Sequence, residues 1–344
     1  MAADLLASVG GPWPTVVALA AGIIIPWIYL LLKPPPPKIC GTRRGPPITA
    51  PRIRLRDGRY MAYKEQGVPK DLAKHKVIFV HPFSGSRHSL LQISQEVLEG
   101  LSVYMVAFDR AGYGESDPFP ERSVKSEALD IQELADQLQL GQKFYVVGLS
   151  MGGYPCWACL KHIPHRLAGV AMMAPVVNYW WPGASKEISG EAFSSRPLGD
   201  KITLRIAHYA PWLMHTWSKQ TFLPSFLNGI GKEKFMNKMD LEITAARKNA
   251  GIPHQETAIQ QGTSESLHRD LAVGFGKWDF FLANAGVPVH VFQGDEDNLV
   301  PVSIQRHVAE KLPWINYHEL PGVGHLLDFV PGLNDKVLTT LLAS

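Results

Sequence analysis

The sequence contains few cysteines and no acceptor site for N-linked glycans. Only three cysteines, Cys40, Cys156 and Cys159, occur in 344 residues, and no asparagine is followed by x-Ser or x-Thr. This composition excludes a disulfide-dense secreted scaffold and favours a reducing, cytosolic setting. Cys156 and Cys159 form a Cys-x-x-Cys pair, but no second cysteine pair or histidine cluster completes a metal site. We expect no metal and two thiols packed inside a helix, with a redox role less favoured.

A long stretch near the N-terminus lacks charged residues. None occurs from Leu5 to Leu32, and residues 15–32 are almost wholly apolar. A membrane span needs about 20 apolar residues, whereas a cleaved signal peptide needs a basic start, a shorter apolar run and a small-x-small site. We therefore predict an uncleaved membrane anchor, a transmembrane helix within residues 1–33. The weaker alternative is an apolar segment that docks on the folded domain, since Pro26 can break a helix.

Acidic residues are scarce in the segment that follows. Between Lys33 and Arg59 there are eight basic residues and one acid, Asp57, and we assign residues 34–50 to a proline-rich basic linker. The positive-inside rule then predicts a single-pass protein whose folded domain faces the cytosol, on the endoplasmic reticulum or another endomembrane. Because the whole chain has a net charge of only +3, the basic segment fits attraction to anionic lipid rather than nucleic-acid binding.

Short apolar runs alternate with helical stretches over most of the remaining chain. An Asp57-Gly58 turn between alternating runs predicts an antiparallel hairpin at the edge of a sheet. Further strands are expected at residues 77–80, 103–108, 144–147, 169–173, 287–292 and 316–320. This alternation predicts an α/β fold with a mostly parallel central sheet flanked by helices. We assign residues 51–177 and 287–344 to this core.

The strand signals lapse between residues 178 and 286. This segment has mixed helical character and is rich in aromatic residues: Tyr179, Trp180, Trp181, Trp212, Trp217, Phe222 and Phe226. We predict that residues 178–286 form a helical cap inserted over the site. The aromatic residues can line an apolar pocket or belong to the ordinary core, and the sequence supports both readings equally.

A Gly-x-Ser-x-Gly motif places Ser150 between a predicted strand and a predicted helix. The run FYVVG before it is apolar, and the run GGYPCWACLKHI after it starts a helix. Gly148 and Gly152 leave room for a cramped turn that pushes the serine hydroxyl out above the sheet. Ser150 is therefore the candidate nucleophile. The alternative is an incidental serine in a glycine-rich surface turn.

One of the thirteen histidines has the placement that a catalytic base requires. A serine hydroxyl needs a base to take its proton, and neutral imidazole suits this task near pH 7. His325 stands in a Gly-x-Gly-His turn after the strand expected at residues 316–320 and before a final helix. His162 and His165 fall near the end of the helix after the serine, and His307 lies on a predicted surface helix, where solvated or capping roles are expected. We therefore select His325.

The base in turn needs a carboxylate to orient it. Asp295, Glu296 and Asp297 all follow the strand expected at residues 287–292. We select Asp297 because the next helix starts just after it, with Pro301 near the first turn, which leaves Asp297 on the loop at the sheet edge. Asp295 is the fallback, and a merely solvated acidic loop is the alternative.

Together these residues resemble the α/β-hydrolase fold superfamily, from Pro51 to the C-terminus. The run KVIFVHPFSGS is similar to the strand and oxyanion loop of that superfamily. The run AFDRAGYGESDP is similar to the segment that braces the active site in the branch with a helical cap. The N-terminal pattern LLKPPPPKICGT followed by PRIRLRDGRYMAYKEQG resembles a plant group of membrane-anchored members.

The resemblance implies an oxyanion hole made by two backbone amides. These are the amides of Met151 and Phe83, which would receive the negative charge of a tetrahedral intermediate. Family members usually have glycine after the histidine of the oxyanion loop, whereas this chain has Pro82. Proline fixes φ and removes an amide, so Pro82 either tolerates the usual path of the loop or bends it.

The resemblance also assigns structural roles to three residues near the site. It implies that His81 packs and hydrogen-bonds beneath the oxyanion loop, and that Asp109 and Arg110 form a structural pair. It implies no organic cofactor. Epoxide hydrolysis and dehalogenation are disfavoured, because the related enzymes have an aspartate where this chain has Ser150.

The function expected from these features is that of a membrane-anchored serine hydrolase. It would cleave carboxylic esters, lipophilic or lipid esters above all, through an acyl-enzyme. One alternative is an acyltransferase that uses the same residues. The other is a small-molecule receptor or scaffold on the same fold with little turnover. The natural substrate and the oligomeric state are left open.

Overall fold

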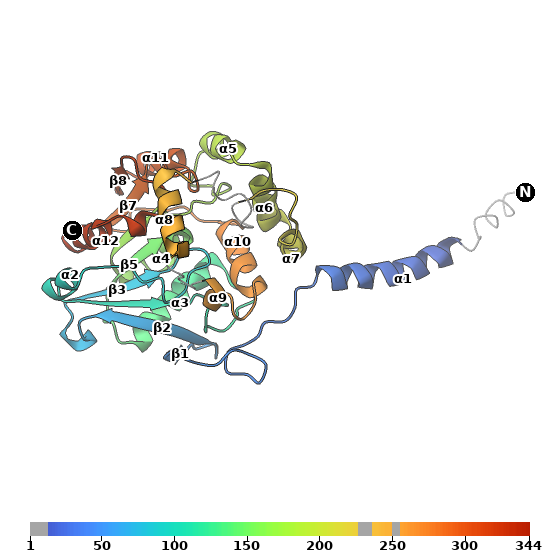
Figure 1. Ribbon diagram of the computed structural model, residues 1–344, viewed down its shortest axis with the longest axis horizontal. Coiled ribbons are helices and arrows are strands. Elements are labelled where there is room, and N and C mark those ends of the chain that lie inside the picture. Colours follow the sequence, from blue (N-terminus) through green and yellow to red (C-terminus); the bar gives the residue numbers. More distant parts are fainter. Residues whose placement is uncertain (1–12, 226–235, 250–254) are drawn as a thin grey trace, which may run out of the picture.

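The N-terminal helix extends outward from the folded domain, which it contacts near its own C-terminal end through a hydrogen bond of 3.4 Å from the hydroxyl of Thr216 to the carbonyl oxygen of Leu31. The computed structural model describes residues 13–225, 236–249 and 255–344, and the first helix, α1 (Trp13–Leu32), projects away from the folded domain (Figure 1). Among the described residues no helix is both long and apolar enough to cross a membrane. The transmembrane helix expected within residues 1–33 is therefore not confirmed, and residues 1–12 lie outside the described part of the chain.

A mostly parallel sheet of eight strands forms the centre of the described structure, in the order β1-β2-β4-β3-β5-β6-β7-β8. The strands are β1 (Arg52–Arg54), β2 (Tyr60–Gly67), β3 (His75–Val80), β4 (Val103–Phe108), β5 (Phe144–Leu149), β6 (Leu167–Met173), β7 (Val289–Gly294) and β8 (Asn316–Leu320). β2 pairs antiparallel with β1 and with β4, and all other neighbours are parallel. The expected hairpin and parallel sheet are confirmed.

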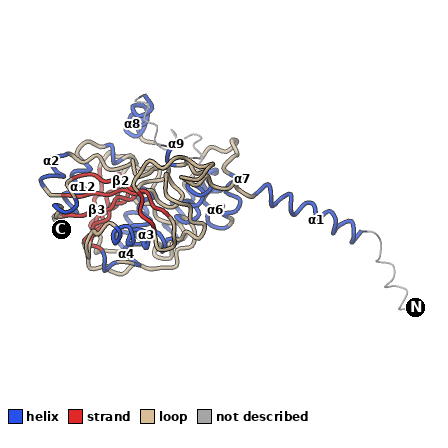
Figure 2. Tube along the Cα trace, turned by 90° about the horizontal axis from the view of Figure 1, so that it is seen from below, coloured by secondary structure: helices blue, strands red, loops and turns tan. Residues whose placement is uncertain are grey.

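Helices cover both faces of this sheet. Successive side chains of a strand point to opposite faces, and in β3 Ile78 and Val80 belong to one buried cluster whereas Val77 and Phe79 belong to the other. The first cluster includes side chains of α3 (Val124–Gln137), α4 (Gly153–His162) and α11 (Val302–Lys311), and the second includes side chains of α2 (Gln95–Gly100) and α12 (Leu333–Leu342). Figure 2 shows α2 and α12 on one side of the strands and α3 and α4 on the other.

The described residues between β6 and β7 form helices. These are α5 (Lys186–Ser194), α6 (Leu198–Tyr209), α7 (Met214–Trp217), α8 (Lys238–Asn249), α9 (Gln255–Ala258) and α10 (Arg269–Gly274). Of the aromatic residues in this segment, Trp181 is buried in the core, whereas Trp212 and Phe222 are exposed. Phe226 lies outside the described residues. The limits 178–286 of the cap stay a prediction.

A buried network of charges connects this inserted segment to the core. The carboxylate of Asp270, on α10, accepts hydrogen bonds of 2.8 Å from the guanidinium groups of Arg110 and Arg122 and from the hydroxyls of Tyr113 and Tyr154. All five side chains are buried. Burial alone would raise the pKa of Asp270, but the two arginines outweigh it and lower the pKa to about 2. Asp270 is therefore held as an anion between two cations.

The expected pair of Asp109 and Arg110 does not form, and that prediction is wrong. Asp109 instead accepts hydrogen bonds from Arg87, from its guanidinium at 2.5 Å and from its backbone N–H at 2.7 Å, while Arg110 binds Asp270. The two residues follow β4 directly, and neighbouring side chains of an extended chain point in opposite directions. Each therefore finds its partner on a different side of the strand.

We expect Asp270→Ala to lower the free energy of unfolding by about 3–5 kcal/mol, because it leaves two buried guanidinium groups without their shared carboxylate. Denaturant unfolding of the parent and the variant measures this loss. Asp279→Ala removes an exposed carboxylate from the same part of the chain and should change the stability by less than about 0.5 kcal/mol.

The contribution of Asp270 should also depend on pH. Because folding lowers its pKa from 3.8 to about 2, the stabilisation is fully present above the ordinary pKa and is lost as the pH falls toward 2. An Asp270→Ala variant as stable as the parent at neutral pH would contradict this account.

Candidate active site

Ser150 stands on a sharp turn between β5 and α4. Its φ is +53°, in the left-handed region that non-glycine residues rarely adopt. A Cβ atom added to Gly148 would lie 2.4 Å from the carbonyl oxygen of Gly152, and one added to Gly152 would lie 2.1 Å from the carbonyl oxygen of Val80. Gly148 is thus required for the turn to close on itself, and Gly152 is required for the turn to pack against the end of β3. The cramped turn expected from the motif is confirmed.

The structure brings Ser150, His325 and Asp297 together at the carboxyl edge of the sheet. The hydroxyl of Ser150 lies 2.9 Å from Nε2 of His325, and Nδ1 of His325 lies 2.8 Å from Oδ2 of Asp297. All three side chains are buried. The serine follows β5, the aspartate follows β7 and the histidine follows β8, so the carboxyl ends of three parallel strands deliver the three groups to one place.

The carboxylate of Asp297 is held by its own loop as well as by His325. Its Oδ1 accepts hydrogen bonds from the backbone N–H groups of Leu299 at 2.8 Å and Val300 at 2.9 Å. Its Oδ2 accepts a further bond from the side-chain amide of Gln293 at 3.0 Å. These donors fix the carboxylate that faces the imidazole.

Asp295, the fallback acid, lies in the same loop but serves a different partner. Its Oδ1 accepts a hydrogen bond of 2.7 Å from the backbone N–H of Gly322, in the loop that follows β8. Of the two candidate acids, Asp297 is therefore the one bonded to His325.

The electrostatic surroundings favour a proton on His325. Burial alone would lower its pKa, but the carboxylate of Asp297, helped by those of Asp240 and Asp328, outweighs burial and raises the pKa above its ordinary value of 6.5. Because Nδ1 donates to Asp297, the neutral imidazole presents an unprotonated Nε2 to the Ser150 hydroxyl. That arrangement lets His325 accept a proton from the serine.

His81 lies beneath the loop that follows β3, as expected. It is fully buried, its Nδ1–H donates to the carbonyl oxygen of Pro82 at 2.8 Å, and its Nε2 accepts from the backbone N–H of Arg110 at 3.1 Å. Burial, with the nearby charge of Arg110, lowers the pKa of His81 well below its ordinary value. The neutral ring thus braces the loop that carries Pro82 and Phe83.

The loop after Pro82 makes a tight turn toward the site. The backbone N–H of Gly85 donates to the carbonyl oxygen of Pro82 at 3.0 Å, and Ser84 has a φ of +56°. This turn brings Phe83 to the lining of the cavity that also contains Ser150 and Met151. The oxyanion hole expected from Phe83 and Met151 stays a prediction.

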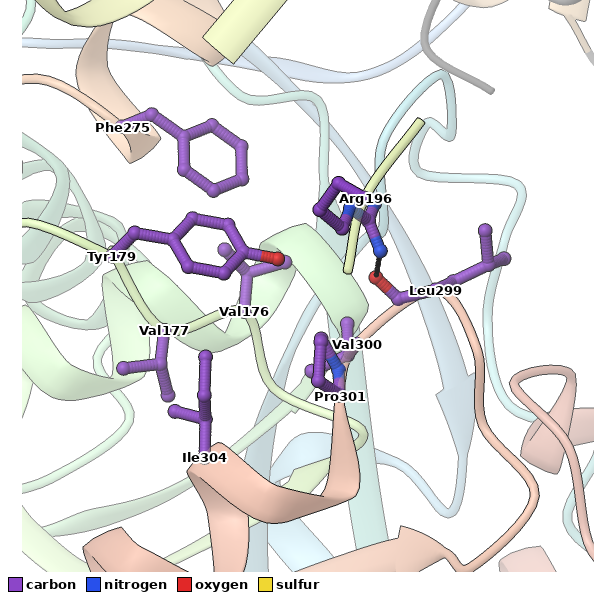
Figure 3. Close-up of a pocket in the computed structure, with 9 residues that line it drawn as sticks. All are labelled: Val176, Val177, Tyr179, Arg196, Phe275, Leu299, Val300, Pro301 and Ile304. Carbon is purple, nitrogen blue, oxygen red and sulfur yellow. Dashed lines mark hydrogen bonds between the residues drawn. The ribbon is translucent and has the colours of Figure 1, made fainter. Parts of the chain in front are cut away.

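One cavity is lined by Ser150, and a second cavity adjoins it. The first encloses about 410 Å³ of empty space, solvent at its mouth included, and is lined by Phe83, Ser150, Met151, Val176, Arg196, Leu204, Phe275, Leu299, Val300 and His325. The second, of about 280 Å³, shares five of these residues and adds Val177, Tyr179, Pro301 and Ile304 (Figure 3). Most of the lining is apolar, which suits the hydrocarbon part of a ligand.

Arg196 is an arginine that lines both cavities. It comes from the residues between α5 and α6, and Figure 3 shows it opposite Tyr179 and Phe275. Its Nη1 donates to the carbonyl oxygens of Asn298 at 3.1 Å and Leu299 at 2.8 Å. No local motif reveals which arginine of a long helical insertion turns inward, so Arg196 could not be predicted from the sequence.

Other residues singled out in the sequence have structural roles, and Cys156 packs against the turn that carries Ser150, with its Sγ 3.3 Å from the carbonyl oxygen of Gly152. His162 ends α4, and Cys156 and Cys159 are buried free thiols on that helix, as expected. His307 was expected in a solvated or capping role on a surface helix. The solvated role is wrong, because α5 covers this side of α11 and His307 is buried. Its Nε2 accepts a hydrogen bond of 3.1 Å from the backbone N–H of Ser185, the N-cap residue of α5. Among the described residues no group of His, Cys, Asp and Glu is arranged to hold a metal ion.

The family was identified by comparison with known proteins. A model described as "Alpha/beta hydrolase family" matches residues 77–333, which include Ser150, Asp297 and His325. A search of curated proteins found no match to this chain.

Several solved structures share the fold at low sequence identity. A thermophilic esterase from Thermogutta terrifontis is 19% identical, with 85% of this chain and 96% of that chain covered and a TM-score of 0.53. An enol-lactonase from Burkholderia xenovorans LB400 is 16% identical, with 86% and 100% covered and a TM-score of 0.57. An esterase from Exiguobacterium antarcticum is 14% identical, with 86% and 100% covered and a TM-score of 0.57. Because the family model matches well over half of the residues of this chain, the chain belongs to the alpha/beta hydrolase family.

Proposed function

We propose that this protein is a serine hydrolase that cleaves carboxylic esters through an acyl-enzyme. The observation that carries the proposal is the continuous chain of hydrogen bonds from Ser150 through His325 to Asp297. It begins at a serine with a strained backbone that lines a cavity. A nucleophile bonded to a base, with the base oriented by a carboxylate, is the arrangement that acyl transfer requires.

In the first half of the reaction, Oγ of Ser150 attacks the ester carbonyl carbon while Nε2 of His325 takes the hydroxyl proton. The backbone amides of Met151 and Phe83 would stabilise the oxyanion that forms. The intermediate then collapses, the bond to the alcohol oxygen breaks, and His325 returns its proton to the departing alcohol. Asp297 stabilises the imidazolium throughout these steps.

In the second half, water hydrolyses the acyl-enzyme. His325 takes a proton from water, the hydroxide attacks the acyl carbon, and Oγ of Ser150 leaves with the proton that His325 returns. The products are a carboxylic acid and the regenerated serine. Replacement of water by an alcohol would make the same residues an acyltransferase.

The apolar cavities support lipophilic esters as the substrate class. Val176, Phe275 and Val300 line both the cavity that contains Ser150 and the cavity that adjoins it. Apolar walls favour the hydrocarbon part of an ester. The structural neighbours include esterases and an enol-lactonase; a lactone is a cyclic ester and falls within the same chemistry. The narrower resemblance to a plant membrane-anchored group stays a prediction.

We expect Ser150→Ala to abolish turnover of p-nitrophenyl esters and labelling by a fluorophosphonate, because both need the serine oxygen as nucleophile. Turnover with acyl chains of increasing length, beside labelling of parent and variant, measures this. A parent that folds but neither labels nor turns over would sink the hydrolase proposal and favour the receptor alternative. Turnover that survives in Ser150→Ala would show that another group does the chemistry.

The rate should fall on the acid side as His325 becomes protonated. Because its pKa is raised above 6.5 and only the neutral imidazole accepts the serine proton, kcat/KM should decline as the pH falls through that raised pKa. Asp297→Asn should lower kcat by about 10,000-fold, as loss of the orienting carboxylate does in a serine triad. Rate profiles from pH 5 to pH 9 measure both effects.

Asp295→Asn is the matched control for this experiment. It removes a carboxylate from the same loop that is bonded to Gly322 rather than to His325. It should keep the parent's rate and also the parent's acid limb, which is the part of the pH–rate profile where the rate declines at low pH. A large loss in Asp295→Asn with little change in Asp297→Asn would reverse the assignment of the acid.

We also propose that residues 1–33 attach the enzyme to a membrane, with the folded domain in the cytosol. The support is that α1 leaves large apolar side chains exposed, such as Ile23 at 72% and Leu30 at 69%, and that a basic linker follows it. Exposed apolar surface of this kind favours burial in lipid. Basic residues beside it are attracted to anionic headgroups.

In flotation with vesicles that contain anionic lipid, the full chain should float. Ile23→Glu combined with Leu30→Glu should reduce the floating fraction, because charged side chains oppose burial in hydrocarbon. Leu72→Glu is the control, since Leu72 is equally exposed at 73% but lies on the folded domain. A full chain that stays in the aqueous fraction, or a double variant that floats like the parent, would contradict the attachment.

A further inference from the structure

A helix of the inserted segment is docked on the two loops that carry the catalytic base and its acid. This helix is α8, coloured yellow-orange in Figure 1. It lies far from both loops in the sequence, between β6 and β7. Two side chains of α8, Asp240 and Arg247, contact these loops or the residues next to them, and so does Asn237, which directly precedes the helix.

The main contact is made by the carboxylate of Asp240, which is fully buried. Its Oδ2 accepts a hydrogen bond from the backbone N–H of His325 at 2.9 Å, and its Oδ1 accepts one from the backbone N–H of Leu326, also at 2.9 Å. The side chain of Asn237 fixes Asp240 in turn, because its Oδ1 accepts from the backbone N–H of Asp240 at 2.8 Å. One carboxylate thus holds two successive amides of the loop at the position of the base.

The loop is shaped to admit this carboxylate. A Cβ atom added to Gly324 would lie 2.3 Å from Oδ2 of Asp240 and 2.5 Å from Oδ1 of Asn237. Real Cβ atoms do not approach other atoms so closely, so the contact requires glycine at this position. The Gly-x-Gly-His turn therefore serves the docking of α8 as well as the exposure of His325.

Two further contacts fix the position of α8. The side-chain amide of Asn237 donates to Oε2 of Glu296 at 3.0 Å, which ties the start of the helix to the loop that carries Asp297. Near the other end of the helix, the guanidinium of Arg247 lies 4.4 Å from the ring centre of Phe329, just beyond the histidine loop. The helix thus contacts the loops of both the acid and the base.

The charges that face His325 come from three elements. Asp297 belongs to the loop after β7, Asp328 to the turn after the histidine, and Asp240 to α8. The positive charge of Arg247, also on α8, partly offsets the negative charge of Asp328. All three carboxylates favour the protonated imidazole. Removal of the Asp240 charge should therefore shift the titration of His325 downward, whereas a purely steric disturbance of the contact should not.

We propose that Asp240 is a positioning residue that holds His325 in register with Ser150, so that the active site is complete only while α8 is docked. The inference rests on the proposed function, since it concerns the same base. Asp240 contacts no reacting atom and acts through the backbone of the loop. A displacement of about 1 Å in a catalytic group can cost about 100-fold in rate, which is the scale of effect that this contact can control.

The test uses the full chain and three variants. Asp240→Asn keeps the shape of the side chain but removes its charge and one of its two acceptor oxygens. Gly324→Ala keeps the charge and crowds the same contact from the other side. Glu242→Gln is the control, because Glu242 is an exposed acid on α8 that pairs with Lys238 at 3.9 Å.

We expect Asp240→Asn to lower kcat on a p-nitrophenyl ester by about 10- to 100-fold with little change in KM, and to move the acid limb of the rate profile to lower pH. Gly324→Ala should lower kcat in the same range and leave the acid limb closer to that of the parent. The double variant should lose less than the product of the two single losses, because both break one contact. Glu242→Gln should match the parent.

An Asp240→Asn variant that melts with the parent and keeps its kcat and acid limb would overturn the proposal. A loss expressed only as a raised KM would overturn it too, since that would assign Asp240 to substrate binding. If Asp240→Asn does not fold, Gly324→Ala tests the same contact.

Failure of the proposed function would be recognised separately by histidine NMR. The His325 ring signal, identified by its loss in His325→Gln, reports the pKa of the imidazole without any turnover. If the parent does not cleave esters but Asp240→Asn still lowers that pKa and shifts the ring signal, the contact stands and the hydrolase proposal falls. An unchanged His325 titration beside normal ester turnover would sink the positioning role alone.

Discussion

The close packing of the Ser150 turn against the end of β3 is the constraint on which the active site depends. No side chain larger than hydrogen fits at Gly152, because the carbonyl oxygen of Val80 occupies the space that a Cβ atom would need. The left-handed backbone at Ser150 costs on the order of 1–3 kcal/mol. The buried strands and α4 on either side of the turn hold it in place, and the serine hydroxyl is directed toward His325 as a result.

Two carboxylates complete the site by binding backbone amides of neighbouring loops. Asp297 accepts hydrogen bonds from two backbone N–H groups of its own loop and from the imidazole of His325. Asp240, on a helix of the inserted segment, accepts hydrogen bonds from two backbone N–H groups of the histidine loop. Hydrogen bonds to a carboxylate are about twice as strong as those between neutral groups, so each loop is held by a few short contacts. The base is thereby supported from the sheet on one side and from the insertion on the other.

Much of this architecture could be predicted because its signals are local. The hairpin, the parallel strands and the cramped turn at Ser150 follow from the alternation of apolar residues, from Asp57-Gly58 and from the spacing of the glycines. The order of the serine, acid and histidine motifs also placed the three side chains at the same edge of the sheet. The partners of Asp109 and Arg110 could not be predicted in this way, since adjacent residues can project to opposite sides of a strand. The burial of His307 depended on α5, which lies far from it in the sequence.

The sequence by itself determined the strands and the turn that bears Ser150, and it predicted His325 as the base, because each depends on residues within a few positions of one another. It favoured Asp297 over Asp295 as the acid, and it contained no signal for the contacts of Asp240, Arg196 or Asp270. Only the tertiary structure decided these contacts. Hydrogen bonds between distant residues depend on how loops and the inserted helices pack against the sheet, and that packing is a property of the whole fold rather than of any local stretch of chain.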